Sequence, residues 1–152
     1  TGRPLGKSTK RALQLETSPW KPMPHPGHWD NNHRADCWLV AKDGDRVVGW
    51  SALHPVPYQE VYSGVAEVSV YVAEYARGKG EGRALLNSSA SASEPAGVRT
   101  LQGNILVENE ASIALHSAGG IRTVGTKERI GRLYGRWRDT VFMERRSDVG
   151  GA

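Results

Sequence analysis

The chain has 152 residues, the size of one domain, and is long enough to bury a hydrophobic core without disulfides or a metal. Its single cysteine, Cys37, excludes a disulfide within the chain, and no apolar run approaches the roughly 20 residues of a membrane-spanning helix. The N-terminus has no apolar stretch typical of a secretory signal, so we expect a cytoplasmic protein without a membrane partner.

The net charge of +4 comes entirely from the C-terminal part of the chain. Residues 1–119 carry 12 basic and 12 acidic side chains, whereas residues 120–152 carry 8 basic and 4 acidic ones. Such a patch can attract an anionic ligand, but alternating arginines are also typical of the solvent-exposed face of terminal strands. Because the patch has neither an aromatic stacking pattern nor a recognition motif, we expect no nucleic-acid partner.

Residues 1–34 form a poorly patterned N-terminal segment of the same domain, and four prolines between positions 19 and 26 exclude a regular helix there. The segment contains three histidines and Asp30, but their spacing fits no strong metal-site template, so we expect no metal. Residues 38–41 and 47–53 flank Asp43-Gly44-Asp45, which predicts a β-hairpin.

Residues 65–72 alternate well enough to predict a third long strand, with Glu67 facing away from the side that carries Val68. The remaining pattern predicts a helix from Gly80 to about Ala92, a strand over 100–107, a helix over 109–118, and final strands near 123–128 and 137–145. The chain therefore reads as one mixed α/β domain, with its core over residues 35–146 and a tail over 147–152.

A glycine-rich segment, Arg77-Gly78-Lys79-Gly80-Glu81-Gly82-Arg83, joins a predicted strand to a predicted helix. Glycines allow a tight turn and a close approach of the backbone, and a helix N-terminus presents free N–H groups to an anion. The spacing differs from that of a nucleoside-triphosphate loop, and no acidic ribose ligand follows as in a dinucleotide fold. The segment predicts a pyrophosphate site, and a glycine turn without a ligand stays open as the alternative.

Arg77-x-x-Gly80-x-Gly82 resembles the Arg/Gln-x-x-Gly-x-Gly/Ala signature of the GNAT N-acetyltransferases. Three further segments resemble the phosphinothricin acetyltransferase-like branch of that family: residues 66–72 its fourth strand, 109–116 its cofactor-side helix, and 134–139 its C-terminal His-Gly-x-Trp-x-Asp segment. The match covers roughly residues 35–146, and four motifs in the same order make it specific at the level of the family.

The resemblance implies an α/β (α+β) fold with a central mixed, mostly antiparallel sheet that is splayed between two strands and flanked by helices. A complete member begins with a strand and a helix, for which residues 1–11 are too few, so we expect this part to be short or missing. The resemblance also implies acetyl-CoA as co-substrate and a homodimer. The residues expected to bind the cofactor are Val70, Tyr71, Val72, Arg77, Gly78, Lys79, Gly80, Glu81, Gly82, Arg83 and Asn109.

Two residues are expected to carry the chemistry. An amine must be neutral to attack an acyl group, so a base is useful, and Glu67 matches the family's proposed base. His116 stands where many members place the residue that protonates the leaving thiolate. The alternatives are a structural carboxylate paired with an arginine for Glu67 and a helix-capping imidazole for His116.

The acceptor is expected near Tyr62, together with Val61 and Glu60, which precede the fourth strand of the family. Members that act on small acidic amino acids often carry basic residues in this stretch, but residues 58–64 contain no Arg or Lys. Arg132 or Arg136 could supply the positive charge from elsewhere, across a dimer interface.

The leading hypothesis is an acetyl-CoA-dependent N-acyltransferase that acetylates the primary amine of a small molecule, an amino acid or an amino-acid analogue, with Glu67 as general base. The alternative is a catalytically silent acyl-CoA-binding sensor module. Loss of turnover in Glu67→Gln would distinguish the first hypothesis from the second.

Overall fold

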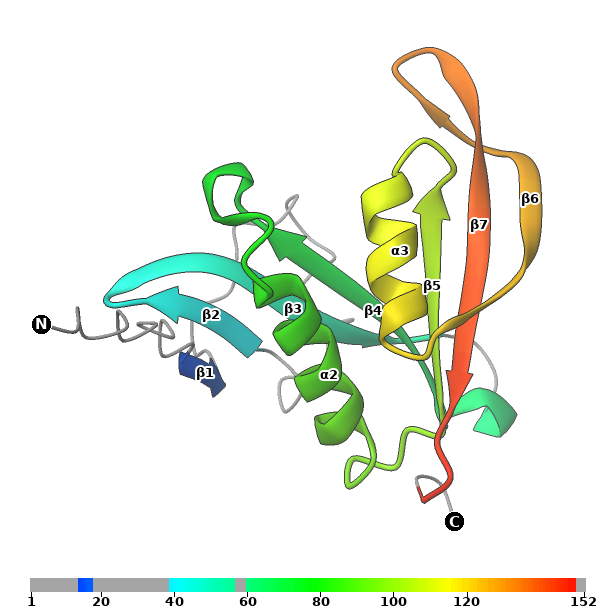
Figure 1. Cartoon of the computed structure of the whole chain (residues 1–152). Coiled ribbons are helices and arrows are strands. Elements are labelled where there is room, and N and C mark those ends of the chain that lie inside the picture. Colours follow the sequence, from blue (N-terminus) through cyan, green and yellow to red (C-terminus); the bar gives the residue numbers. More distant parts are fainter. Residues whose placement is uncertain (1–13, 18–38, 57–59, 150–152) are drawn as a thin grey trace, which may run out of the picture.

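The computed structural model of the chain describes residues 14–17, 39–56 and 60–149, and these residues form an open sheet with helices packed on it (Figure 1). The strands run in the order β1-β2-β3-β4-β5-β7-β6, and only β4 and β5 pair in parallel. Their bounds are β1 Gln14–Thr17, β2 Leu39–Asp43, β3 Arg46–Pro55, β4 Val65–Val72, β5 Thr100–Leu106, β6 Arg122–Leu133 and β7 Arg136–Arg146. The expected mixed, mostly antiparallel sheet is therefore confirmed.

The predicted hairpin at Asp43-Gly44-Asp45 is present, with Gly44 in the left-handed conformation at φ 62°. A strand also lies within the segment expected to be poorly patterned, because β1 pairs antiparallel with β2 from Gln14 to Thr17. The histidines at 25, 28 and 33, and Asp30, lie outside the described residues. Among the residues that the structure describes, no group of three or more potential metal ligands occurs.

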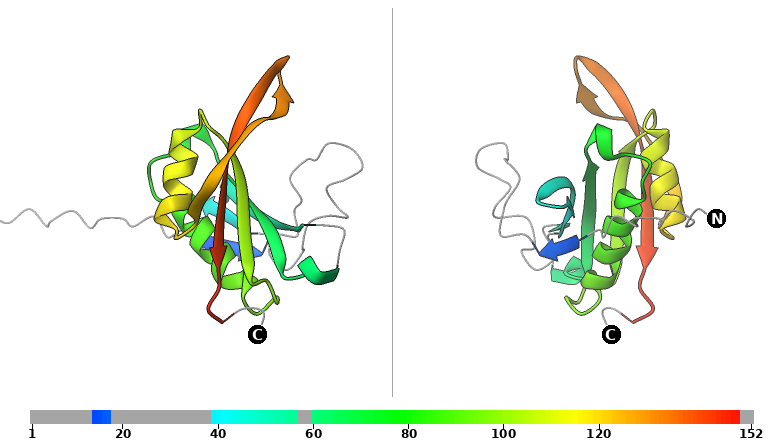
Figure 2. Two further views of the ribbon diagram at one scale, coloured as in Figure 1. Left: turned by 90° about the vertical axis from the view of Figure 1, so that its right-hand side faces the viewer. Right: turned by 60° about the vertical axis from the view of Figure 1, so that its left-hand side comes forward.

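Two helices, α2 Glu81–Ser93 and α3 Glu110–Ala118, lie on the same face of the sheet (Figures 1 and 2). Short 3₁₀ turns at Glu60–Tyr62 and Glu74–Ala76 flank β4. No helix in the described ranges is long and apolar enough to cross a membrane.

The helix α2 is anchored to the sheet by leucines in its first half and by small serines in its second half. Leu85 and Leu86 are fully buried, and the hydroxyls of Ser89 and Ser51 of β3 lie 2.7 Å apart in a buried hydrogen bond. The serine-rich half, which has weak helix propensity, therefore remains helical because short side chains let it lie close to β3.

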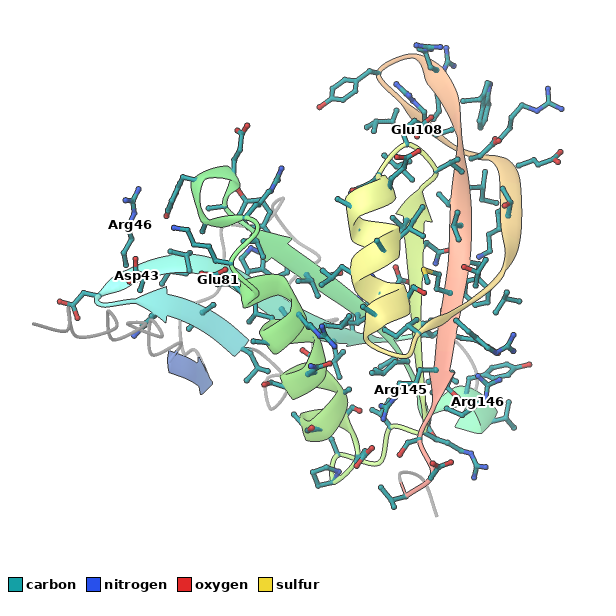
Figure 3. All side chains as sticks on the ribbon, in the orientation of Figure 1. Asp43, Arg46, Glu81, Glu108, Arg145 and Arg146 are labelled. Carbon is teal, nitrogen blue, oxygen red and sulfur yellow. The ribbon has the colours of Figure 1, made fainter. Side chains whose placement is uncertain are left out.

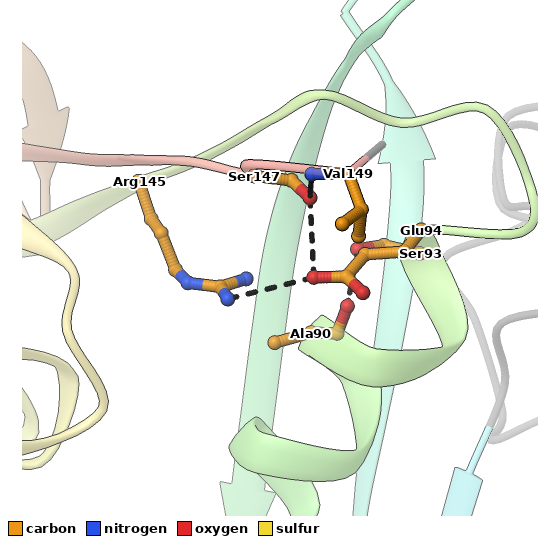
Figure 4. Close-up of polar contacts among 6 residues, drawn as sticks. All are labelled: Ala90, Ser93, Glu94, Arg145, Ser147 and Val149. Carbon is orange, nitrogen blue, oxygen red and sulfur yellow. Dashed lines mark hydrogen bonds and ion pairs between the residues drawn. The ribbon is translucent and has the colours of Figure 1, made fainter. Parts of the chain in front are cut away.

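The end of α2 is tied to the end of β7 (Figure 4). The carboxylate of Glu94 accepts a hydrogen bond of 3.1 Å from the Ser147 hydroxyl, and it lies 3.6 Å from the Arg145 guanidinium. These contacts join two segments that are far apart in the sequence, and they fix the helix across the core.

The last two strands are longer than the sequence predicted, and they form a hairpin that extends beyond the rest of the sheet (Figures 1 and 2). The turn is made by Tyr134 and Gly135, whose φ angles of 50° and 73° are those of a tight left-handed turn. Where the hairpin passes the end of β5, the Arg138 guanidinium lies 3.5 Å from the Glu108 carboxylate.

Strand β4 leaves β5 after a short stretch of pairing. The parallel ladder runs only from Val65 to Glu67 on β4 and from Thr100 to Gln102 on β5. Beyond it, residues 68–72 pair with β3 alone, and residues 103–106 pair with β7 alone. The expected splay between two strands is thus present, and it opens a gap immediately after Glu67.

Candidate active site

The glycine turn connects β4 to α2 and leaves the first N–H groups of the helix without a side-chain cap. Gly78 and Gly80 have φ angles of 79° and 88°, a conformation that strains any residue with a Cβ. Gly80 is the N-cap of α2, and in the part of the chain that the structure describes no side chain caps the first-turn amides. These amides and the positive end of the helix dipole can therefore receive a phosphate.

Two contacts on the β4 side fix the position of this turn. The Nε of Arg77 donates a hydrogen bond of 3.2 Å to the carbonyl of Val72, the last residue of β4. The amide of Ala73 donates to the carbonyl of Val48 on β3 at 2.8 Å. The arginine of the motif therefore closes the loop at the end of β4.

A cavity of about 430 Å³ lies between the glycine turn, the splayed end of β4 and the start of α3. Ten of the eleven residues expected to bind the cofactor line it, and Lys79 is the exception. Ala111, Ser112 and Leu115 of α3 complete the lining, and the sequence had not singled them out. The glycine segment, the fourth strand and Asn109 thus meet around one space, as a cofactor site requires.

Glu81 contributes to this cavity in an unexpected way. Its side chain is 5% exposed where α2 begins (Figure 3), and its Oε2 has no hydrogen-bond partner among the described residues. A buried carboxylate oxygen without a partner is unfavourable, although the helix dipole partly compensates it. The backbone N–H of Glu81 can donate a hydrogen bond to a bound anion, whereas its carboxylate would repel that anion.

A second cavity, of about 280 Å³, adjoins the first and contains both residues expected to be catalytic. It lies in the gap between β4 and β5, and Glu67 and His116 line it together with Ser69, Gly103 and Asn104. Val70, Asn109 and Ser112 line both cavities. The two proposed catalytic side chains therefore stand next to the proposed cofactor site.

His116 is buried, with 4% of its surface exposed. Burial lowers the pKa of its imidazole, and the hydrogen bond with the Ser112 carbonyl opposes that effect in part. Because that carbonyl, 2.7 Å from Nδ1, can only accept, the proton is assigned to Nδ1. A neutral ring then leaves Nε2 as a hydrogen-bond acceptor, and a Cβ at Gly103 would lie 3.7 Å from this atom.

Glu67 has a neighbour that the sequence had not indicated. His54 on β3 stands directly opposite Glu67 in the antiparallel ladder, and its Nε2 lies 3.7 Å from the Glu67 Oε2. The two side chains are 29% and 27% exposed. Among the residues that the structure describes, no arginine pairs with Glu67, which was the structural alternative, and its charged neighbour is an imidazole. The register between the two strands would have revealed this pair, but a single sequence does not give it.

Asn109 caps α3, because its Oδ1 accepts a hydrogen bond of 3.2 Å from the Ser112 amide. The cap occupies the amide oxygen and leaves Nδ2 as the group that can donate to a ligand in the cavity. The structural and the proposed ligand-binding roles of this residue are thus compatible.

The residues expected at the acceptor site lie apart from both cavities. Val61 and Tyr62 are 80% and 52% exposed on the 3₁₀ turn before β4, and neither lines the cavities. Glu60 belongs to the same turn. The described structure therefore does not bring this turn together with Glu67 and His116.

Comparison with known proteins gives one family match and several relatives. The profile of the acetyltransferase (GNAT) family matches residues 8–120. The chain is 32% identical to the phosphinothricin N-acetyltransferase of Streptomyces coelicolor over 93% of this chain and 81% of the relative. It is 36% identical to the phosphinothricin N-acetyltransferase of Alcaligenes faecalis, and 35% identical to the L-methionine sulfoximine/L-methionine sulfone acetyltransferase of Pseudomonas aeruginosa. These two matches cover 74% and 70% of this chain, but the chain spans only 58% and 62% of those relatives.

Solved structures resemble the chain in the same way. A ribosomal-protein-alanine N-acetyltransferase from Brucella melitensis aligns with a TM-score of 0.70 at 38% identity, over 72% of this chain and 68% of that one. A GNAT-superfamily phosphinothricin acetyltransferase from Sinorhizobium meliloti, solved in complex with acetyl-CoA, aligns with a TM-score of 0.67 at 34% identity, over 72% and 60%.

Proposed function

Because this chain belongs to the GNAT acetyltransferase family, we propose that it is an acetyl-CoA-dependent N-acetyltransferase acting on the primary amine of a small molecule. The observation that carries the proposal is the continuity of the two cavities through Val70, Asn109 and Ser112. One cavity has the free helix N-terminus that suits a pyrophosphate, and the other has the ionisable groups that suit acyl transfer.

The residues present fit acetyl-CoA. The left-handed Gly80 and the uncapped first turn of α2 would hold the pyrophosphate, with Arg77 and Arg83 supplying positive charge at the same cavity. The edge of β4 over residues 68–72 has no strand beside it on the β5 side, so its backbone groups suit the amides of a pantetheine arm. When bound, acetyl-CoA supplies a thioester whose acetyl group can pass to an amine.

Glu67 would act as the general base. At neutral pH an amine arrives as an ammonium ion, and a carboxylate in the adjoining cavity can take its proton directly or through a water molecule. The backbone N–H of Val70 or Tyr71, at the mouth of the gap, would donate to the acyl oxygen as negative charge develops on it.

His116 would pass a second proton to the leaving sulfur. Because its lowered pKa keeps the ring neutral, the resting imidazole has no proton on Nε2 to give. It would first accept the proton that nitrogen loses as the C–N bond forms, and then donate it as the C–S bond breaks. The expected general-acid role thus requires an acceptor step before it.

The acceptor proposed here is an amino acid or an amino-acid analogue, the class that the relatives' names print: phosphinothricin, methionine sulfoximine and methionine sulfone. The described lining of the second cavity contains no arginine or lysine to bind a carboxylate. We propose that a homodimer supplies it, with Arg132 or Arg136 on the β6–β7 hairpin of a second copy. Exposed Ile130, Leu133 and Trp137 on the same hairpin, 57%, 41% and 60% accessible, support an interface there.

The test is a screen over amino acids, sulfoximines, sulfones and polyamines, in which acetyl-CoA consumption is measured as the release of free thiol. We expect turnover with at least one amine, and a fall in kcat of about 100-fold or more in Glu67→Gln. Tight binding of acetyl-CoA without turnover on any amine would contradict the proposal and favour a silent sensor module.

A further inference from the structure

His54 is an ionisable residue within ion-pair range of Glu67. It belongs to β3, which pairs with β4 on the side opposite the gap between β4 and β5. His54 and Glu67 are cross-strand partners in the β3–β4 ladder, so their side chains lie on the same face of the sheet. The 3.7 Å between Nε2 and Oε2 is within ion-pair range and slightly longer than a hydrogen bond. A small rotation of either side chain brings the two atoms into hydrogen-bonding distance.

The position of Glu67 links the cavity to this histidine. Glu67 is the last residue of β4 that pairs with β5, and its side chain lines the cavity in the gap. Among the described residues that line this cavity, only Glu67 and His116 are ionisable. His116 reaches the cavity from α3, whereas His54 reaches Glu67 from β3.

The proton balance of the reaction explains why a proton-accepting residue beside Glu67 would be useful. Acetyl transfer from a thioester to an ammonium ion forms a C–N bond and breaks a C–S bond. The nitrogen loses two protons, of which the sulfur takes one, so one proton leaves the site in each turnover. Glu67 must release that proton before it can act as a base again. The side chains of Glu67 and His54 are 27% and 29% exposed, so the proton can leave either directly or through His54.

We propose that His54 is a positioning residue that holds the Glu67 carboxylate toward the cavity and carries the proton from Glu67 to solvent. The inference rests on the proposed function, because it assigns to His54 a role that acts only through Glu67. The imidazole suits the role, since Nε2 faces Glu67 and can take up a proton and release it again to water, whereas Nδ1 is buried.

A double-mutant cycle tests the dependence on Glu67. We expect His54→Gln to lower kcat about tenfold and to leave KM for acetyl-CoA unchanged, because the cofactor cavity does not include His54. In the Glu67→Gln background the same substitution should cause no further loss, because the residue through which His54 acts is already absent. An equal loss in both backgrounds, or a wild-type kcat in His54→Gln, overturns the inference.

Rescue by diffusible buffers distinguishes proton transfer from a purely structural contribution. Imidazole and a second, unrelated buffer of similar basicity should restore kcat of His54→Ala in proportion to buffer concentration, and should not restore Glu67→Gln. Absence of rescue by both buffers overturns the relay. Val47→Ala, at the far end of β3 and 41% exposed, is the matched control and should keep wild-type kcat.

The two proposals fail in different ways. If the wild-type chain acetylates no amine, the proposed function fails and the relay fails with it. If the wild type turns over and His54→Gln turns over equally fast, only the relay is overturned. Unchanged thermal unfolding of the His54 variants ensures that a lower kcat reports on catalysis and not on a loss of folded protein.

Discussion

Gly82 lies so close to Leu115 that a Cβ at position 82 would come within 3.1 Å of the leucine Cδ2. The same Cβ would lie 3.4 Å from Cγ2 of Val72, at the end of β4. The third glycine of the motif therefore marks the point where α2, α3 and β4 meet, at the floor of the cofactor cavity. Its role differs from that of Gly78 and Gly80, which shape the turn itself.

At position 82 we expect the size of the new side chain to decide how much stability and acetyl-CoA binding change. Gly82→Ala gains about 1 kcal/mol of helix propensity and loses a comparable amount to the contact with the flexible end of Leu115. Its free energy of unfolding should therefore change little. Gly82→Val has branches that Leu115 and Val72 cannot both avoid, so it should lower stability by about 1–3 kcal/mol and weaken acetyl-CoA binding. Denaturant unfolding and calorimetric titration check this, and a Gly82→Val protein with wild-type affinity would contradict it.

Gly80 is constrained by its backbone conformation and not by space. At φ 88° an alanine is strained, although no atom lies within 4 Å of its Cβ. We expect Gly80→Ala to cost about 1–2 kcal/mol and to reduce acetyl-CoA affinity, because the turn must shift. Gly125, which also has open space but no positive φ, is the matched control. Gly125→Ala should unfold and bind like the wild type, and equal effects at both positions would refute the conformational explanation.

Replacing the buried carboxylate of Glu81 should increase both the stability of the protein and its affinity for acetyl-CoA. Glu81→Leu removes the unpartnered Oε2 and a negative charge beside the proposed phosphate position. We expect a gain of about 1 kcal/mol in the free energy of unfolding and tighter acetyl-CoA binding. Glu81→Gln separates the two effects, because it removes the charge and keeps a buried polar group. A weaker-binding Glu81→Leu protein would show that the carboxylate assists the ligand.

The lowered pKa of His116 should appear in the pH dependence of stability. Because the folded state binds the proton less readily than the unfolded chain, whose imidazole titrates near 6.5, the stabilising contribution is complete above that value. It is lost as the pH falls through 6.5 toward the folded-state pKa. Urea unfolding between pH 5 and 8 should show stability falling with acid, and the fall should be smaller in His116→Gln. Identical pH profiles for the two proteins would contradict the buried, neutral imidazole.

Local sequence signals predicted the parts of the site that depend on local geometry. The turn at Gly78 and Gly80 and the helix that begins at Asn109 both appear where the sequence placed them, because they depend on local backbone conformation. The cap that the Asn109 side chain makes was not predicted. The gathering of Glu67 and His116 around one cavity followed from resemblance to a family, and not from any pattern within this chain.

Features that depend on distant pairing were missed. The contact of His54 with Glu67 requires the register of two strands that residues 56–64 separate in the sequence, and a single sequence does not specify that register. The length of the last hairpin was underestimated because Tyr134 occupies a left-handed turn position at which Asn or Asp would have been the expected signal. The burial of Glu81 was not foreseen, since a charged residue in a glycine-rich turn reads as exposed.

The parallel ladder between β4 and β5 spans three residues on each strand. The sheet therefore consists of two parts, one with strands β1 to β4 and the other with strands β5, β7 and β6. The two parts are joined by the short ladder that ends at Glu67, and α2 packs across them. A ligand in the gap would hold the two parts at a fixed separation, because it would hydrogen-bond to the edge of β4 and pack against the part that contains β5. Ligand binding in the gap would then make the sheet more rigid, and the angle between its two parts would change as the site forms.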